Sequence, residues 1–165
     1  MVLAVSKDLI TLERVRDFRP AVQEAVVALG RMAHAESGHR HLSLDLDYLL
    51  ENSESFTRMA SKAFWLAWEG ERPVGVFAGI VHDYYFSRDL IAEDSLWYVV
   101  PDKRGTRVGL QLLELFEEWA EGQDVVDVRV GQTSNLDPRV FNGVLGGRGY
   151  ENVGSYFVRS TINDV

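Results

Sequence analysis

The sequence predicts an α/β fold of the α+β kind, in which helices flank a mixed, mostly antiparallel central sheet. Three β-rich segments follow one another over residues 63–100 with only short turns between them, as in antiparallel sheets. Residues 97–113 then read as the end of a strand, a glycine-containing turn and an amphipathic helix. A further strand-like segment follows, and this strand–helix–strand crossover implies parallel pairing with the strand before the turn.

The length and composition of the sequence limit the classes of protein to which it can belong. The 165 residues, 46% of them hydrophobic, suffice for one well-filled core and predict a single domain over residues 1–165. The absence of cysteine excludes disulfide scaffolds and thiolate nucleophiles and suits a reducing cytoplasm. No run resembles a signal peptide or is long enough to span a membrane. The net charge of −8 argues against a wide nucleic-acid interface and mildly favours a cationic substrate.

The N-terminal part predicts one strand and two helices. Residues 9–15 have strand character, and Pro20 suits the first position of a helix with one apolar stripe. Ser43 is the predicted N-cap of a second helix, which reaches about Glu51. Residues 52–61 are predicted as a loop or a frayed extension of that helix.

The central part predicts strands over residues 63–68, 74–86 and 91–100. Turn residues separate these strands at 69–73 and at 87–89. We therefore expect each strand to pair antiparallel with the next.

The C-terminal part continues the alternation of helices and strands. The helix after the glycine turn carries an apolar stripe and ends near Gly122, and residues 124–130 predict the strand that completes the crossover. Asp137 and Pro138 open a short helix, and residues 150–162 predict one or two closing strands. The buried positions expected in the long helix are Val108, Leu112, Leu113, Phe116 and Trp119.

The turn before the long helix has the features of an anion site. Glycine lets the backbone approach a ligand closely, and the N–H groups of a helix's first turn lack internal partners, so phosphate commonly binds there. Lys103, Arg104 and Arg107 crowd the positive end of the helix, and a bound anion would offset their unfavourable interaction with its dipole. The alternative is a solvated turn whose cations only serve solubility.

The order of elements resembles the GCN5-related N-acetyltransferase (GNAT) family, and the turn carries a matching motif. The family pattern V-x-P-x-x-R-G-x-G-x-G aligns without a gap on Val99, Pro101, Arg104, Gly105 and Gly109. The resemblance extends over residues 9–160. Its downstream matches to the family's Asn and Gly-Phe are Asn135 and the pair Gly149 and Tyr150.

Two positions depart from the family pattern. Arg107 replaces the first glycine of the G-x-G, which limits how closely the backbone can approach a cofactor but adds a cation within reach of a phosphate. Leu145 stands where the family often places a tyrosine that protonates the departing thiol. The cofactor position and the identity of the acid are therefore open.

The resemblance implies acetyl-CoA (coenzyme A) as co-substrate and no metal. Pantetheine would pair with the strand backbone of Trp97 and Val99, and the pyrophosphate would lie on the N–H groups that follow Gly105, with Arg104 or Arg107 adding charge. The implied cofactor-binding residues are Trp97, Val99, Arg104, Gly105, Thr106, Arg107, Val108, Gly109, Leu110 and Asn135.

Acyl transfer to an amine needs a base, because an alkylammonium with a pKa near ~10.4 is almost wholly protonated at neutral pH. The resemblance points to Glu93, on the strand before the turn, acting directly or through water. Strand alternation predicts that Glu93, Ser95, Trp97 and Val99 share one face and that Asp94 lies on the other. Asp94 is the second candidate for the base, and a Glu93 that merely faces solvent is the plain alternative.

Tyr150, Ser134 and Tyr98 can each donate a proton to the departing thiolate, and Tyr150 is taken as the catalytic candidate. A thiol pKa near ~8.5 also allows departure without a dedicated acid.

Three histidines, His34, His39 and His41, lie close in the sequence but lack the spacing of a metal site. The resemblance places this region at the wall of the acceptor pocket, so the imidazoles could contact substrate or simply lie on the surface.

The resemblance therefore implies an acetyl-CoA-dependent N-acetyltransferase that acts directly on a primary amine of a small molecule or a protein. The competing hypothesis is a non-catalytic acyl-CoA-binding regulatory or interaction module with the same fold, which Arg107 and Leu145 motivate. We expect a cytoplasmic protein with no nucleic-acid or membrane partner. The oligomeric state stays open, a homodimer included.

Overall fold

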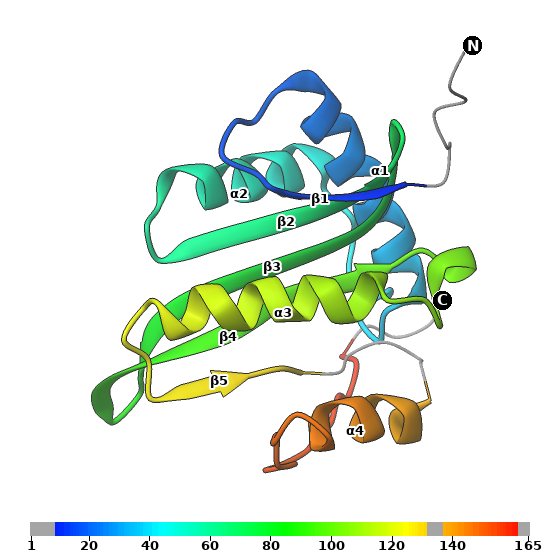
Figure 1. Ribbon diagram of the computed structural model, residues 1–165. Helices are drawn as coiled ribbons and strands as arrows, with labels where there is room; N and C mark the ends of the chain where they lie inside the picture. Colours follow the sequence, from blue (N-terminus) through cyan, green and yellow to red (C-terminus); the bar gives the residue numbers. More distant parts are fainter. Residues whose placement is uncertain (1–8, 132–136, 162–165) are drawn as a thin grey trace. The chain divides into compact units, whose positions relative to one another are not determined.

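The computed structural model describes residues 9–131 and 137–161 (Figure 1). The chain divides into two compact units, residues 1–134 and 135–165. The prediction of a single domain is not decided by this division and stays a prediction. In chain order the elements are β1 (Ile10–Arg14), α1 (Pro20–Glu36), α2 (Leu46–Arg58), β2 (Lys62–Glu69), β3 (Arg72–Tyr84), β4 (Ser87–Val99), the 3-10 turn η1 (Pro101–Lys103), α3 (Val108–Glu121), β5 (Asp127–Arg129) and α4 (Pro138–Gly146).

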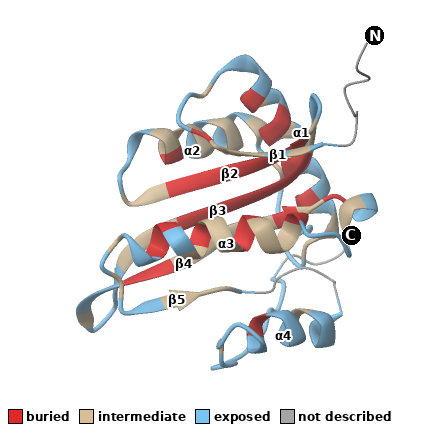
Figure 2. Cartoon of the chain, in the orientation of Figure 1, coloured by how far each residue is buried: buried red, intermediate tan, exposed pale blue. Residues whose placement is uncertain are grey.

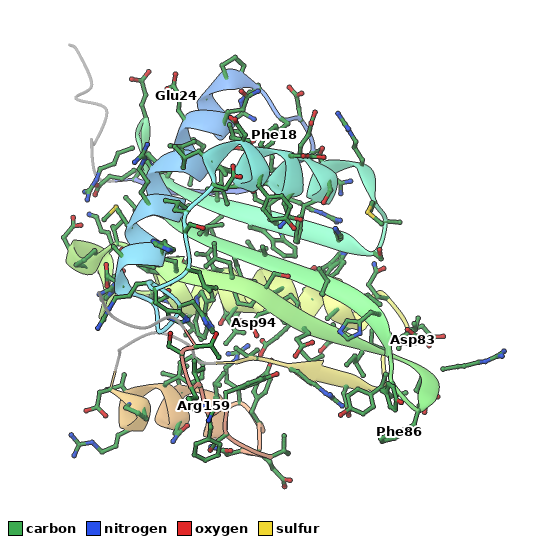
Figure 3. All side chains as sticks on the ribbon, turned by 180° about the vertical axis from the view of Figure 1, so that it is seen from behind. Phe18, Glu24, Asp83, Phe86, Asp94 and Arg159 are labelled. Atoms are coloured by element: carbon green, nitrogen blue, oxygen red, sulfur yellow. The ribbon has the colours of Figure 1, made fainter. Side chains whose placement is uncertain are left out.

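The first unit contains a five-stranded sheet in the order β1-β2-β3-β4-β5. Strands β1 to β4 pair antiparallel with their neighbours, and β5 pairs parallel with β4, as the crossover predicts. Helix α3 packs on one face of the sheet, whereas α1 and α2 pack on the other, as the opposite views of Figures 1 and 3 show. The predicted mixed, mostly antiparallel sheet flanked by helices is therefore confirmed.

The buried residues are apolar among those described, and they concentrate in β2, β3 and the helices packed on the sheet (red in Figure 2). On the α3 face, Phe77 stacks on Phe116 with ring centroids 4.6 Å apart. Gly79 of β3 lies under the same helix, and a Cβ added there would come within 2.4 Å of the Phe116 ring. Glycine at this position therefore lets α3 pack closely against the sheet.

Helix α2 is longer than the sequence predicts. Asp45, not Ser43, caps it, because the Asp45 carboxylate accepts the Tyr48 N–H at 3.0 Å. The helix continues to Arg58, through residues predicted as a loop or a frayed extension of the helix. Phe56 explains this, since its buried ring packs edge-on against Phe64 of β2 and anchors the last turns to the sheet.

The hairpin between β3 and β4 turns earlier than predicted. Tyr84 pairs with Ser87, which leaves Tyr85 and Phe86 as the two-residue loop, and β4 begins at Ser87. The turn-forming residues at 87–89 therefore lie inside a strand. Pairing with β3 outweighs their local preference.

The second unit contains α4, which begins as predicted. The Asp137 carboxylate accepts the Arg139 N–H at 2.9 Å and caps this helix. The prediction of closing strands is wrong for residues 150–161, which form no strand in the structure. Apolar side chains in this stretch, such as Tyr156 and Phe157, are instead more than nine-tenths exposed. No other segment among the described residues pairs with this stretch, so β propensity alone does not make it a strand.

Candidate functional site

Strands β4 and β5 separate partway along their length. Their pairing covers Ile91 to Glu93 of β4 and Asp127 to Arg129 of β5, and within the described residues it goes no further. The Val100 N–H donates to Val74 of β3 at 3.0 Å, so by antiparallel alternation the backbone groups of Val99 and Trp97 point away from β3. They face the side from which β5 has diverged, where an extended ligand could lie against β4.

The turn from η1 into α3 presents unpaired amides. Gly105 adopts a φ of +79°, a left-handed conformation that favours glycine. Within the described part of the chain, the N–H groups of Gly105, Arg107, Gly109 and Leu110 have no acceptor. The Arg107 side chain gives α3 no N-cap bond. Such a cluster of amides at a helix N-terminus suits a phosphate.

Gly109 brings α3 close to β4 beside these amides. A Cβ added to Gly109 would lie 3.5 Å from Val99 Cγ2 and 3.8 Å from the Trp97 ring. The anion-binding end of the helix therefore adjoins the open side of β4, where Val99 and Trp97 lie.

Only one of the three cations at this turn is unpaired among the described residues. Lys103 forms an ion pair with Glu69. The Arg104 guanidinium donates from Nη2 to Glu36 Oε2 at 2.6 Å and from Nε to the Val99 carbonyl at 3.0 Å. Arg107 is exposed and has no partner there. The Arg107 charge is thus available for a ligand, and a contact of the already paired Arg104 with the cofactor stays a prediction.

Glu36 joins the end of α1 to this turn, a contact that the sequence did not predict. Tyr98 donates its hydroxyl hydrogen to Glu36 Oε1 at 2.6 Å, and Arg104 lies over the Tyr98 ring. Burial and this hydrogen bond raise the pKa of Tyr98 well above its usual value. Although burial alone would raise the pKa of Glu36, the bonds from Tyr98 and Arg104 lower it. Tyr98 therefore retains its proton and is a poor acid for a departing thiolate.

A β-bulge at Ser95 changes which side chains share a face. Ala78 pairs with Leu96 and Gly79 with Asp94, so Ser95 is the extra residue in β4. Asp94 consequently lies on the α3 face, like its partner Gly79, and Trp97 shares this face with Asp94 rather than with Glu93. The predicted placement of Glu93 and Trp97 on one face is therefore wrong, because simple alternation does not hold across a bulge.

Glu93 lies on the opposite face and pairs with a histidine. Its Oε2 is 3.0 Å from His82 Nε2, and His82 Nδ1 is 2.8 Å from the Asp83 carbonyl. The hydrogen bond to the Asp83 carbonyl, followed by that to Glu93, raises the pKa of His82. Both side chains are nearly two-fifths exposed, so the pair remains open to a ligand.

Asp94 lies where β4 and β5 diverge, and Figure 3 labels it beside that point. Its Oδ1 accepts the Gly131 N–H at 2.6 Å, which ties the segment after β5 to β4. Burial raises the pKa of Asp94 to about 6, and the Gly131 bond only partly opposes this. Sequence reasoning named Asp94 but not this position at the divergence of the strands.

A cavity of about 320 Å³ opens between α1, α2 and the sheet. His34 and His39 line it, as do Ser95 and Leu96 at the bulge. His41 is not among the lining residues, and the expectation that this region walls the acceptor pocket stays a prediction. No group of His, Asp and Glu in the described residues could hold a metal ion.

Three further residues are candidates from the sequence. Asn135 lies outside the described residues, as does Ser134. Tyr150 belongs to the second unit, where its N–H donates to the Leu145 carbonyl at 3.1 Å. Its proposed role as the acid for the thiol stays a prediction.

The open side of β4 next to the unpaired amides at the start of α3 is an arrangement that suits an extended, phosphate-bearing ligand. The sequence matches the acetyltransferase (GNAT) family over residues 28–137, two-thirds of the chain, and the protein belongs to this family. It is therefore an acetyltransferase, and acetyl-CoA is the co-substrate of the family. No curated protein matches the sequence significantly.

Solved structures with low sequence identity share the fold. AAC(6')-Iy in complex with a bisubstrate analogue, CoA-S-monomethyl-acetylneamine, has a TM-score of 0.71 at 13% identity, covering 94% of this chain and 99% of that one. The aminoglycoside acetyltransferase meta-AAC0020 from an uncultured soil metagenomic sample, in complex with sisomicin, has a TM-score of 0.66 at 14% identity, with coverage of 93% and 97%. A transcriptional regulator from Bacillus halodurans C-125 has a TM-score of 0.70 at 14% identity, with coverage of 92% and 99%.

None of the described helices is both long and apolar enough to cross a membrane.

Proposed function

We propose that the protein transfers an acetyl group from acetyl-CoA directly to a primary amine of a small molecule or a protein. The observation that carries this proposal is the set of unpaired amides at the start of α3, next to the side of β4 that β5 leaves open. The amides suit a diphosphate, and the open strand suits the amides of pantetheine.

Different residues around the turn would bind different parts of acetyl-CoA. The N–H groups of Gly105, Arg107, Gly109 and Leu110 would hold the diphosphate, and the Arg107 guanidinium would add a charge-assisted contact. Thr106 supports the turn, because its hydroxyl donates to the Lys103 carbonyl at 2.6 Å and accepts the Val108 N–H at 3.4 Å. The backbone of Trp97 and the N–H of Val99 would pair with pantetheine, since the Val99 carbonyl already accepts from Arg104, while Asn135 remains a proposed contact.

Glu93 is the proposed base. In the reaction the amine nitrogen bonds to the acetyl carbon, the carbon–sulfur bond breaks, and the products are an amide, the free thiol and one released proton. Glu93 would accept the ammonium proton, directly or through water, and His82 orients its carboxylate. Asp94 is the alternative, because a pKa of about 6 also suits a base near neutral pH. Tyr150 remains the proposed acid for the thiolate.

The competing proposal is a regulatory module that binds acyl-CoA without turning it over. Two departures from the family pattern favour it: Arg107 replaces a glycine of the motif, and Leu145 replaces the tyrosine that often protonates the departing thiol. A reducing cytoplasm suits either proposal, because the chain has no cysteine.

Two measurements separate these proposals. Acetyl-CoA should raise the melting temperature, because a ligand that binds only the folded state stabilises it by mass action. A panel of amines should then release free thiol from acetyl-CoA in the presence of the protein. A thermal shift without thiol release would favour the regulatory module, and no shift with any acyl-CoA would contradict both.

A further inference from the structure

The cavity on the α1 and α2 side of the sheet has an apolar wall. Buried residues such as Leu29, Phe56, Phe64 and Leu66 form much of it. Among the described residues that line the cavity, the polar ones are histidines, serines and an asparagine, and none is Asp, Glu, Lys or Arg. The overall charge of −8 is therefore not reflected inside this cavity.

The chemistry of this wall selects against acceptors with several charges. Each ammonium group that enters an apolar cavity loses part of its hydration, and it needs a carboxylate or several hydrogen-bond acceptors in return. A cavity with no lining carboxylate can compensate the lost hydration of few ammonium groups. An apolar group has no such hydration to lose, and its burial is favourable.

The size of the cavity limits the apolar group. An apolar cavity of about 150 Å³ is known to bind benzene. The volume of about 320 Å³ found here therefore has room for one ring, or a branched aliphatic group, and a short chain.

The cavity also lies next to the proposed base. Ala78 lines it, and strand alternation places Ile80 on the same face of β3. Ile80 pairs with Glu93, so Glu93 follows the cavity along this face. Ser95 and Leu96, which follow Glu93 closely in β4, also line the cavity. If the apolar group of an acceptor fills the cavity, an amine on a short chain would thus lie near Glu93.

We infer that the acceptor is a primary amine with a single positive charge, joined by a short alkyl chain to one aromatic or branched aliphatic group. This inference rests on the proposed function and names the substrate class of the same site. It differs from the aminoglycosides named for similar structures, whose likeness to this chain is one of fold alone.

The test compares amines in an assay of thiol release from acetyl-CoA by the full chain. The singly charged probes are 2-phenylethylamine and isopentylamine, and the multiply charged probes are sisomicin and spermidine. We expect kcat/KM to be at least tenfold higher for the better singly charged probe than for either multiply charged probe. A higher kcat/KM for sisomicin or spermidine would overturn the inference.

A matched pair of substitutions in α1 tests the position of the acceptor. Ala33→Leu places extra carbons at the cavity wall, whereas Ala28→Leu makes the same change at an exposed position that does not line the cavity. Ala33→Leu should raise KM for 2-phenylethylamine at least fivefold, and Ala28→Leu should leave it within twofold. KM for acetyl-CoA should change in neither variant. Equal effects of the two variants on the amine would contradict the assignment.

The failure of the proposed function can be distinguished from failure of this inference. If no amine releases thiol, the binding of 2-phenylethylamine is measured instead. The readout is the change in the amide NMR signals of Leu29, Ala33 and Leu96. Saturable binding that Ala33→Leu weakens would support the cavity assignment and refute only the proposed catalysis. No binding, or binding that shifts other signals instead, would refute the inference itself.

Discussion

Arg104 donates a hydrogen bond to Glu36 at 2.6 Å and so joins the turn before α3 to the end of α1. The family motif predicts a ligand contact for this arginine, whereas the structure gives its guanidinium two partners within the protein. The motif arginine thus holds the strand end, the turn and α1 in place around the anion-binding amides.

Substituting Glu36 tests this link. Glu36→Gln removes the carboxylate charge that pairs with Arg104 and that accepts the hydrogen bond from the Tyr98 hydroxyl. The free energy of unfolding should fall by about 1 kcal/mol, a modest loss because the Glu36 and Arg104 side chains are partly exposed. Urea denaturation measures the change. Glu24→Gln, at an exposed position on the same helix, is the control and should change stability by less than about 0.5 kcal/mol. Equal losses in the two variants would argue against the link.

The close contact of α3 with the sheet makes a second prediction. Gly79→Ala would place a Cβ within 2.4 Å of the Phe116 ring, so the helix or the ring must move, at a cost of about 1–3 kcal/mol. Gly143→Ala in α4 meets no atom within 4 Å and should instead stabilise its helix by about 0.5–1 kcal/mol. Thermal denaturation of both variants checks this contrast. An unchanged Gly79→Ala variant would contradict the packing described here.

Asp94 should make stability depend on pH in a defined direction. Its folded-state pKa of about 6 lies above the ordinary value of 3.8, so the stability tied to its protonated form is present below pH 4 and lost as the pH rises through 6. Asp94→Asn keeps an acceptor for the Gly131 N–H but cannot ionise. At pH 8 the variant should be about 1–3 kcal/mol more stable than the wild type, and near pH 4 this gain should vanish. Urea denaturation of the variant and the wild type at the two pH values measures this difference. An equal gain in stability at both pH values would refute the role of Asp94 ionisation.

The proposed base gives a kinetic prediction. Glu93→Gln should reduce kcat for amine-dependent thiol release by about 10²–10⁴-fold, while the affinity for acetyl-CoA stays within about twofold. The loss should be greatest near neutral pH and smaller at high pH, where more of the amine is already neutral. Asp94→Asn serves as the comparison. If that variant loses kcat while Glu93→Gln retains it, Asp94 takes the role of the base.

Local sequence patterns predicted most elements that position the site. The strand, turn and helix over residues 97–113 depend on neighbouring residues, and their order and the parallel partner of β4 are confirmed. The bulge at Ser95 was not predictable in this way. It depends on the pairing of Asp94 with Gly79 across the strands and on the packing of Gly79 under Phe116.

Long-range partners explain the other differences. Glu36 approaches Arg104 only after α1 has packed on the sheet, so no local pattern links them. The length of α2 likewise depends on the packing of Phe56 against Phe64, two residues on different elements. At the C-terminus, residues 150–161 have β propensity but form no strand, which shows that propensity alone does not supply a partner.

We propose above that the diphosphate of acetyl-CoA binds on the amides at the start of α3. This claim is tested by titrating the isotope-labelled protein with coenzyme A and following the amide NMR signals, with pantetheine as the matched ligand that lacks the diphosphate. We predict that the amide signals of Gly105, Arg107, Gly109 and Leu110 shift with coenzyme A and much less with pantetheine, and that Arg107→Ala raises Kd for coenzyme A several-fold. Saturable binding of coenzyme A that leaves these four signals in place would contradict the claim.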